Sequence, residues 1–154
     1  MSDFAGIDTT ETSTTQKYDI NRIYRIKHPT YGGGAWEYGQ ADEAISAGQA
    51  VFIADSDGGL TLADTTEAGS TKKDVGIADA DIASGSWGWL FRGEGSFEAI
   101  LTNALAAGTN LTTTATGGTL GSGGDTVGDA SSVDAGVTST RVTIQVAGLL
   151  AAGS

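Results

Sequence analysis

Alternation of apolar and polar residues predicts one strand near each end of the chain. Residues 141–146, Arg-Val-Thr-Ile-Gln-Val, alternate cleanly and place three branched apolar side chains on one face. Residues 18–27 alternate less strictly, because Ile23 falls on the face that otherwise carries polar side chains. Successive side chains of a strand point to opposite faces, so both segments fit strands with one face toward a core. Pro29 is expected to end the first strand.

Apolar runs separated by short turn sequences predict two hairpins in the middle of the chain. Residues 50–54 are followed by Asp-Ser-Asp-Gly-Gly and then by residues 60–62, which is good turn chemistry for a hairpin. Residues 86–92 and 96–101 are separated by Gly-Glu-Gly, and we expect them to form a second hairpin at the centre of the core. Its core side chains are Trp87, Trp89, Phe91 and Phe97.

Segments with few apolar residues predict tails and loops. Residues 1–16 are small and polar, and they read either as a loose terminus or as an arm that becomes ordered against a neighbouring subunit. Residues 32–34, Gly-Gly-Gly, are expected to connect the first strand to a short one at residues 35–38. Residues 115–139, rich in Gly, Ser, Thr and Asp, predict a long exposed loop.

The remaining segments complete the predicted layout. A polar loop is expected at residues 64–73, a strand at residues 75–78, and at most one helical turn at residues 41–46. We therefore divide the chain into an extended N-terminal arm, residues 1–16, and a single β domain, residues 17–154.

Two segments match at a spacing of 60 residues. Ala-Gly-Gln-Ala-Val at residues 47–51 aligns with Ala-Gly-Thr-Asn-Leu at residues 107–111, and Gly-Gly-Leu at residues 58–60 aligns with Gly-Thr-Leu at residues 118–120. Each copy predicts a strand entered through a glycine turn, followed by a second turn and a return strand. Two copies are too few for a solenoid, so they fit two equivalent corners of one barrel or sandwich, or a coincidence in a glycine-rich chain.

Composition supports the strand assignments. The 154 residues are 39% hydrophobic and include 24 glycines but one proline, while strong helix formers are scarce. Short strands joined by glycine turns suit this composition better than helices do. The predicted fold is an all-β domain, a small antiparallel β-barrel or β-sandwich with an extended N-terminal arm.

The charge distribution argues against nucleic acid as a partner. The formal net charge is -11, and a surface this acidic repels a phosphate backbone. Half of the eight Lys and Arg residues cluster at Lys17, Arg22, Arg25 and Lys27, where they alternate with Tyr18, Tyr24 and isoleucines. This cluster fits a strand with one wet face better than a nucleic-acid arm.

Residues suited to catalysis or to binding a metal or cofactor are scarce. The chain has no cysteine, and its single histidine, His28, is expected to be solvent-exposed or hydrogen-bonded in a structural role. There is no Gly-x-Ser-x-Gly nucleophile motif, and the glycine-rich residues 117–124 lack the Lys of a phosphate loop. Asp55 and Asp57 open like a calcium loop but lack its later acidic ligands, so a hairpin turn is expected there. We predict no catalytic residue, no metal, no cofactor and no enzymatic activity.

Three further expectations concern surface residues and targeting. Asp79 and Asp81 are expected to face solvent. Trp36, Trp87 and Trp89 favour core packing over a carbohydrate platform. We expect neither a membrane span nor a signal peptide, because the chain lacks both a long apolar run and a basic, then apolar, N-terminus.

The glycine and tryptophan pattern over roughly residues 44–120 resembles the head decoration, or cement, proteins of tailed phages. The residues that carry the resemblance are Val75-Gly76-Ile77-Ala78, Gly85-Ser86-Trp87-Gly88-Trp89-Leu90, Gly93, Phe97–Leu101, Ala107-Gly108 and Gly117-Gly118. The resemblance implies a structural virion protein, made in the host cytoplasm, that binds the outer face of an assembled capsid and clamps neighbouring capsomers.

The partners that the resemblance implies are the major capsid protein and other copies of the chain, as a homotrimer. The contact residues we assign to the capsid or to a neighbouring subunit are Lys17, Tyr18, Arg22, Tyr24, Arg25 and Lys27. The alternative is a tail, fibre or surface-adhesion module that binds glycans through its tryptophans.

Overall fold

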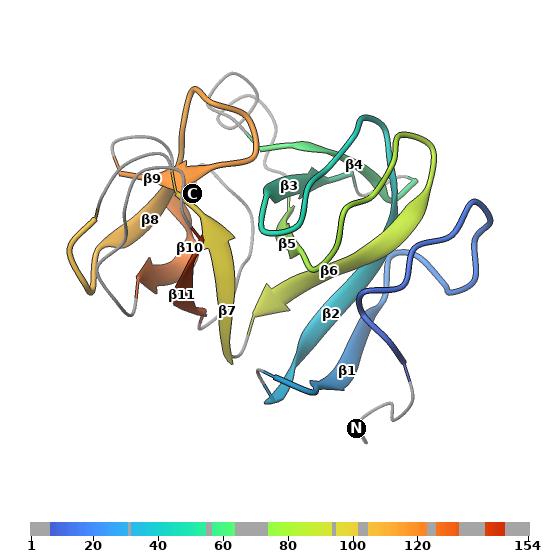
Figure 1. The fold of residues 1–154 in the computed structure, drawn as a ribbon, viewed down its shortest axis with the longest axis horizontal. Coiled ribbons are helices and arrows are strands. Elements are labelled where there is room, and N and C mark those ends of the chain that lie inside the picture. The colour runs from blue at the N-terminus through green and yellow to red at the C-terminus, as the bar shows by residue number, and fades with distance from the viewer. Residues whose placement is uncertain are drawn as a thin grey trace.

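The computed structural model confirms the all-β prediction. It describes residues 7–30, 32–54, 57–63, 74–93, 95–101, 105–122, 126–132 and 141–146, and these contain eleven strands and no helix (Figure 1). The strands are β1 (Ile23–His28), β2 (Gly32–Ala41), β3 (Ala50–Ile53), β4 (Gly59–Leu62), β5 (Asp74–Ala78), β6 (Trp87–Gly93), β7 (Gly95–Ile100), β8 (Asn110–Thr113), β9 (Leu120–Gly121), β10 (Thr126–Ser132) and β11 (Arg141–Val146). The strand predicted at residues 141–146 and the hairpin of β3 and β4 are both confirmed.

The first six strands form a sheet that returns to its own starting strand. Pairing runs from β2 through β4, β3, β5 and β6, and β6 pairs again with β2. All of these pairs are antiparallel except β2–β4, which is parallel and joins only Gln40 to Gly59 and Ala41 to Leu60. The result is a barrel-like ring of five strands, with β1 added along β2 as a sixth.

The last five strands repeat this arrangement. Pairing runs from β7 through β11, β10 and β8 to β9, and all of these pairs are antiparallel. Leu101, directly after β7, then forms a parallel bridge with Leu120 of β9. We call β2–β6 the first unit and β7–β11 the second unit.

The two units correspond at the spacing of 60 residues noticed in the sequence. β3 and β8 have the same length and start 60 residues apart, at Ala50 and Asn110. The parallel pair Ala41–Leu60 of the first unit likewise becomes Leu101–Leu120 in the second. The repeated sequence therefore marks two copies of one five-stranded topology, rather than two corners of a single barrel.

A recurring type II turn explains the repeated glycine. The carbonyls of Ser46 and Ala106 accept hydrogen bonds from the amides three residues later, and Gly48 and Gly108 lie between them at φ 88° and 81°. The third position of this turn needs a positive φ, which glycine adopts without steric cost. The same turn also leads into β6, with Gly85 at φ 83°, a copy that the 60-residue comparison did not find.

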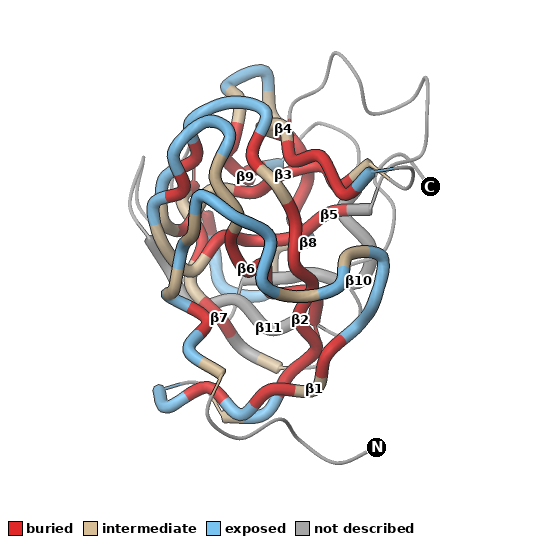
Figure 2. Tube along the Cα trace, turned by 90° about the vertical axis from the view of Figure 1, so that its right-hand side faces the viewer, coloured by how far each residue is buried: buried red, intermediate tan, exposed pale blue. Residues whose placement is uncertain are grey.

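One hydrophobic core joins the two units. A single cluster of buried side chains runs from the aromatic residues of the first unit to Phe97, Leu101, Leu111 and Leu120 of the second (Figure 2). Backbone bonds support the joint: Ile100 N donates to Gly48 O, Ala50 N donates to Gly118 O, and Gly118 N donates to Ala63 O. The two units therefore form one continuous body.

The predicted hairpin of residues 86–101 is wrong, although both of its strands exist. β6 pairs with β2 and β5, whereas β7 pairs with β11, so the two strands belong to different sheets. Gly93, at φ 132°, turns the chain from one unit into the other. The side chains still meet, because Phe91 stacks on Phe97 with ring centroids 5.0 Å apart.

Two segments predicted as connections form strands instead. The glycines at residues 32–34 belong to β2, where they pair with β1, and the side chain of Phe91 comes so close to Gly34 that a β-carbon there would lie 2.8 Å from it. The loop predicted at residues 115–139 contains β9 and β10. Polar residues on short strands gave no alternating pattern by which these strands could be recognised.

Other predictions lie partly or wholly outside the described residues. These are the arm before residue 7, the polar loop at residues 64–73 and the small apolar residues 147–154. The first strand begins at Ile23 instead of Tyr18, because Asn21 takes a left-handed φ of 56° that interrupts an extended chain.

Candidate functional site

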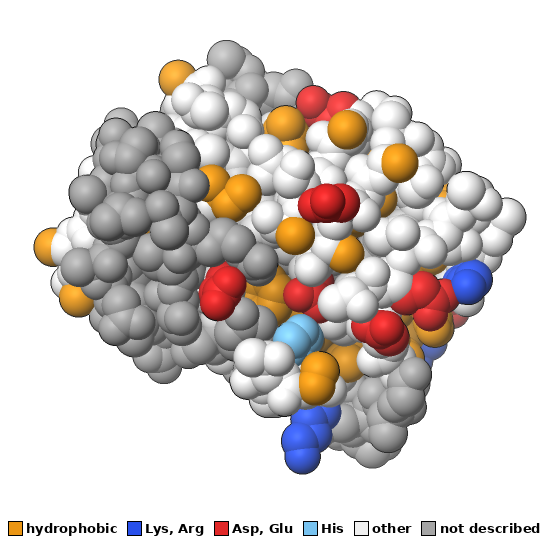
Figure 3. All heavy atoms as spheres, viewed as in Figure 1, with side chains coloured by type: hydrophobic (Ala, Val, Ile, Leu, Met, Phe, Trp, Pro, Cys, Tyr) orange, Lys and Arg blue, Asp and Glu red, His pale blue; other side chains and the backbone are white. Residues whose placement is uncertain are grey.

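The arm and β1 are the parts of the described chain that precede the two repeated units. They carry the basic residues assigned to capsid or subunit contact, and we call residues 17–27 the basic ribbon. On the face shown in Figure 3, the Lys and Arg side chains lie at the edge made by the arm and β1, while acidic side chains are spread over the body. The ribbon is therefore a local exception on a protein with a net charge of -11.

The charged residues of the ribbon differ in how they are held. Lys17 forms an ion pair of 2.6 Å with Glu11, and this hydrogen bond raises the pKa of Lys17. Arg22 lies 3.7 Å from Asp19 and stands over the ring of Tyr24. Lys27 is exposed and Arg25 is half-buried on the outer face of β1. Lys27, Arg25 and the exposed Ile23 form the outward side of that strand.

The two tyrosines of the ribbon are packed into the body. Tyr24 is buried, and Tyr18 packs on Tyr38 and Trp89 with ring centroids 5.2 and 4.8 Å apart. Both tyrosines therefore act mainly as structural residues. The contact surface predicted from the sequence reduces to its charged members.

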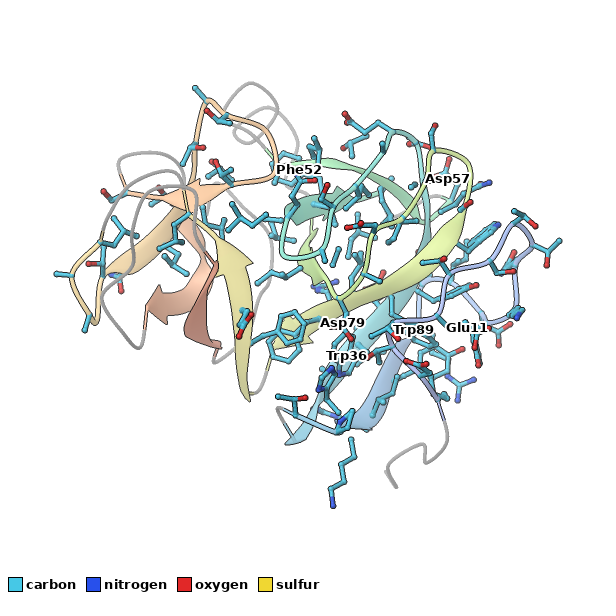
Figure 4. All side chains as sticks on the ribbon, viewed as in Figure 1. Glu11, Trp36, Phe52, Asp57, Asp79 and Trp89 are labelled. Atoms are coloured by element: carbon cyan, nitrogen blue, oxygen red, sulfur yellow. The ribbon has the colours of Figure 1, made fainter. Side chains whose placement is uncertain are left out.

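The tryptophans pack as the sequence favoured. Trp36 and Trp89 are buried, and Trp87 is half-buried and stacks on Tyr38 at 5.7 Å (Figure 4). Phe91 and Phe97 are also buried, so the four predicted core residues meet in one cluster. Burial of Trp89 removes it from any exposed carbohydrate platform.

The described part of the arm lies against its own body. Ser13 and Trp87 exchange two backbone hydrogen bonds, of 3.1 and 2.7 Å, as an isolated antiparallel bridge. Ile7 packs on the core cluster, and the buried Thr9 donates a hydrogen bond to Asp79. We call the surface made by Asp79, Trp87, Tyr38 and Trp89 the arm seat.

A buried polar cluster at the edge of the arm seat was not predicted. His28 Nε2 lies 3.1 Å from Asp79 Oδ2, and the same carboxylate oxygen accepts the Thr9 hydroxyl at 2.6 Å. His28 Nδ1 accepts the Thr30 amide, and the ring stacks on Trp36. The hydrogen-bonded, structural role expected for His28 is confirmed. The solvent-facing position expected for Asp79 is wrong, whereas Asp81 is exposed and accepts the Ala47 amide.

A second buried polar pair lies inside the first unit. Arg92 of β6 donates to Glu37 of β2 over 2.6 Å, and both side chains are 7% exposed. These strands pair side by side, so the ion pair fixes their register. Among the described residues, no group of three or more His, Cys, Asp or Glu side chains could hold a metal ion. In the same residues, no helix has the length and apolar character needed to cross a membrane.

Comparison with known proteins gives one structural likeness. No family model matches the chain, and a search of curated proteins finds no match. The fold is similar to the crystal structure of the N base of the head fibre gp8.5 in bacteriophage phi29, with a TM-score of 0.55 and 19% sequence identity. The match covers 73% of this chain and 92% of that chain. The two proteins therefore share a fold.

Proposed function

We propose that this chain is a structural protein of a phage particle, attached to the outside of the head. The observation that carries the proposal is the fold shared with the N base of a phage head fibre, most of which is matched. The glycine and tryptophan pattern of the sequence, which resembles phage decoration proteins, supports the same class. Packing and hydrogen bonding account for the buried polar side chains of the described residues, which agrees with a structural role.

The specific role we propose is that of a cement protein, acting as a homo-oligomer that stabilises contacts between capsomers. A protein of this kind adds favourable free energy to the assembled shell only, so it raises the resistance of the shell to dissociation. The exposed charges of the basic ribbon, Arg25 and Lys27, are the proposed contacts with the shell. The rest of this acidic chain is less suited to an acidic shell surface.

A fibre base is the second candidate, and the fold likeness favours it specifically because the matched protein is the base of a head fibre. A fibre base occupies the head without strengthening it. Purified heads with and without the protein, heated in parallel, separate the two roles. Cement predicts a lower dissociation temperature when the protein is omitted. Equal heat resistance, with the protein still bound to heads, would leave the fibre base as the surviving role.

The contact assigned to the basic ribbon can be tested with a charge-matched control. Arg25→Gln with Lys27→Gln lowers the net charge by two and should weaken binding to purified heads at least tenfold, with a flatter salt dependence. Ala115→Glu with Ser122→Glu lowers the net charge equally at exposed positions of the second unit. If both double variants bind equally, net charge and not the ribbon governs attachment.

A further inference from the structure

The arm is held by its own small set of contacts, separate from the strand pairing of the body. Its described residues touch the body through Thr9, the Ser13 backbone and the ring of Tyr18. The second unit forms the same five-stranded topology with no arm before it, because β7 follows β6 directly. Removing the arm from its seat would therefore break no strand pair of either unit.

The linker between the arm and β1 has the features of a hinge. Asp19, Asn21 and Arg22 are exposed, and Asn21 holds a left-handed φ of 56° that folds the arm back on its own chain. That conformation costs a non-glycine residue about 1 kcal/mol, although asparagine tolerates it best. An extended linker would remove this cost and would span about 20 Å between Tyr18 and Tyr24. A neighbouring body within that distance could receive the arm.

We propose that residues 7–18 are exchanged between copies, so that each arm occupies the arm seat of a neighbouring copy. The exchanged arm would make the same contacts with Asp79, Trp87 and Trp89 that it makes here. Exchange of an identical element is a low-cost route to a closed oligomer, because the interface already exists within one chain. The proposal rests on the homo-oligomer that the proposed function assigns.

The absence of cysteine from the chain makes a direct test possible. Thr14 and Ser86 follow the Ser13–Trp87 bridge in antiparallel register, where opposed Cα atoms lie about 4.5 Å apart, within reach of a disulfide. Thr12 and Gly88, on the other side of the bridge, are unsuitable because a side chain at Gly88 would collide with Ile82. The full chain carrying Thr14→Cys and Ser86→Cys is oxidised and run on a denaturing gel without reductant.

Arm exchange predicts that most chains run as covalent multimers of the size measured by native mass spectrometry, while either single-cysteine variant gives dimers at most. Covalent monomers from a protein that native mass spectrometry finds oligomeric would overturn the exchange and leave the oligomer standing. A protein that stays monomeric at micromolar concentration would overturn the homo-oligomer as well.

Substitutions at the hinge give an independent measurement. Proline cannot adopt the φ of Asn21, so Asn21→Pro should shift the population at least threefold toward oligomer, whereas Asn21→Gly, which accepts a positive φ, should shift it toward monomer. An unchanged or reversed distribution between the two variants would overturn the hinge.

Discussion

The two units share a topology but fill it differently. The core of the first unit is aromatic, with Trp36, Tyr38, Phe52, Trp89 and Phe91 buried. The described core of the second unit is largely aliphatic, with Phe97 as its aromatic residue. The shared features are the order of strand pairing and the glycine turns at equivalent positions. Strand order and turn chemistry therefore define this unit, whereas the identity of the core side chains is free to vary within the available volume.

The units also differ in what covers them. In the first unit, Gly48 and Ala50 are buried under the second unit. Their counterparts, Gly108 and Asn110, are exposed, and alanine has been replaced by a polar residue. A polar outer face is what a terminal repeat requires to remain soluble. The second unit thus caps the first unit, and the arm and β1 cover the opposite side.

Core truncations should test whether the two units unfold together. Trp89→Ala in the first unit should lower the free energy of unfolding by about 3–5 kcal/mol, and Leu111→Ala in the second by about 2–5 kcal/mol. Because one cluster spans both units, urea titrations should show a single transition in each variant. A separate early transition confined to Leu111→Ala would show that the second unit unfolds on its own.

Alanine substitutions of the turn glycines should rank by what surrounds each turn. Gly85 and Gly108 have positive φ and no atom within 4 Å of an added β-carbon, so Gly85→Ala and Gly108→Ala should each cost about 1–2 kcal/mol from backbone strain. Gly118→Ala should cost more, since the added carbon would lie 2.8 Å from Gln49 at the joint of the units. Equal costs at all three positions, measured by urea denaturation, would show that the joint yields easily.

Loss of the arm latch should have the smallest effect on the body. Thr9→Val keeps the side-chain shape but removes the hydrogen bond to Asp79, at a cost of roughly 0.5–1.5 kcal/mol. That cost falls on the docked arm, so proteolysis near residue 19 should become faster while the urea transition shifts little. A shift as large as that of Leu111→Ala would place the arm within the cooperative core.

The sequence predicted strands better than it predicted their partners. Residues 141–146 and the β3–β4 hairpin carry local signals, alternation and a turn, and both were predicted correctly. Gly-Glu-Gly between residues 92 and 96 gives the same local signal as a hairpin turn, yet the flanking strands join different sheets. Which strand pairs with which depends on non-local contacts that a short window of residues does not contain.

The polar cluster was missed for a similar reason. Thr9 is 70 residues from Asp79 and His28 is 51 residues from it, so nothing in the neighbouring sequence marks them as partners. The 60-residue repeat was the more informative signal, because it compared distant parts of the chain directly. Extended to the strand pairs, it accounts for both parallel contacts.

The order of the units along the chain has a consequence during synthesis. All strands of the first unit lie before residue 94, so this unit can fold on the ribosome before the second unit emerges. Ala50 and Ala63, whose backbone groups bond to Gly118, must then wait for roughly another 25 residues, or about 1–5 s at ordinary translation rates. During that interval the nascent chain displays an uncovered apolar strip, and slow translation of the second unit should favour aggregation.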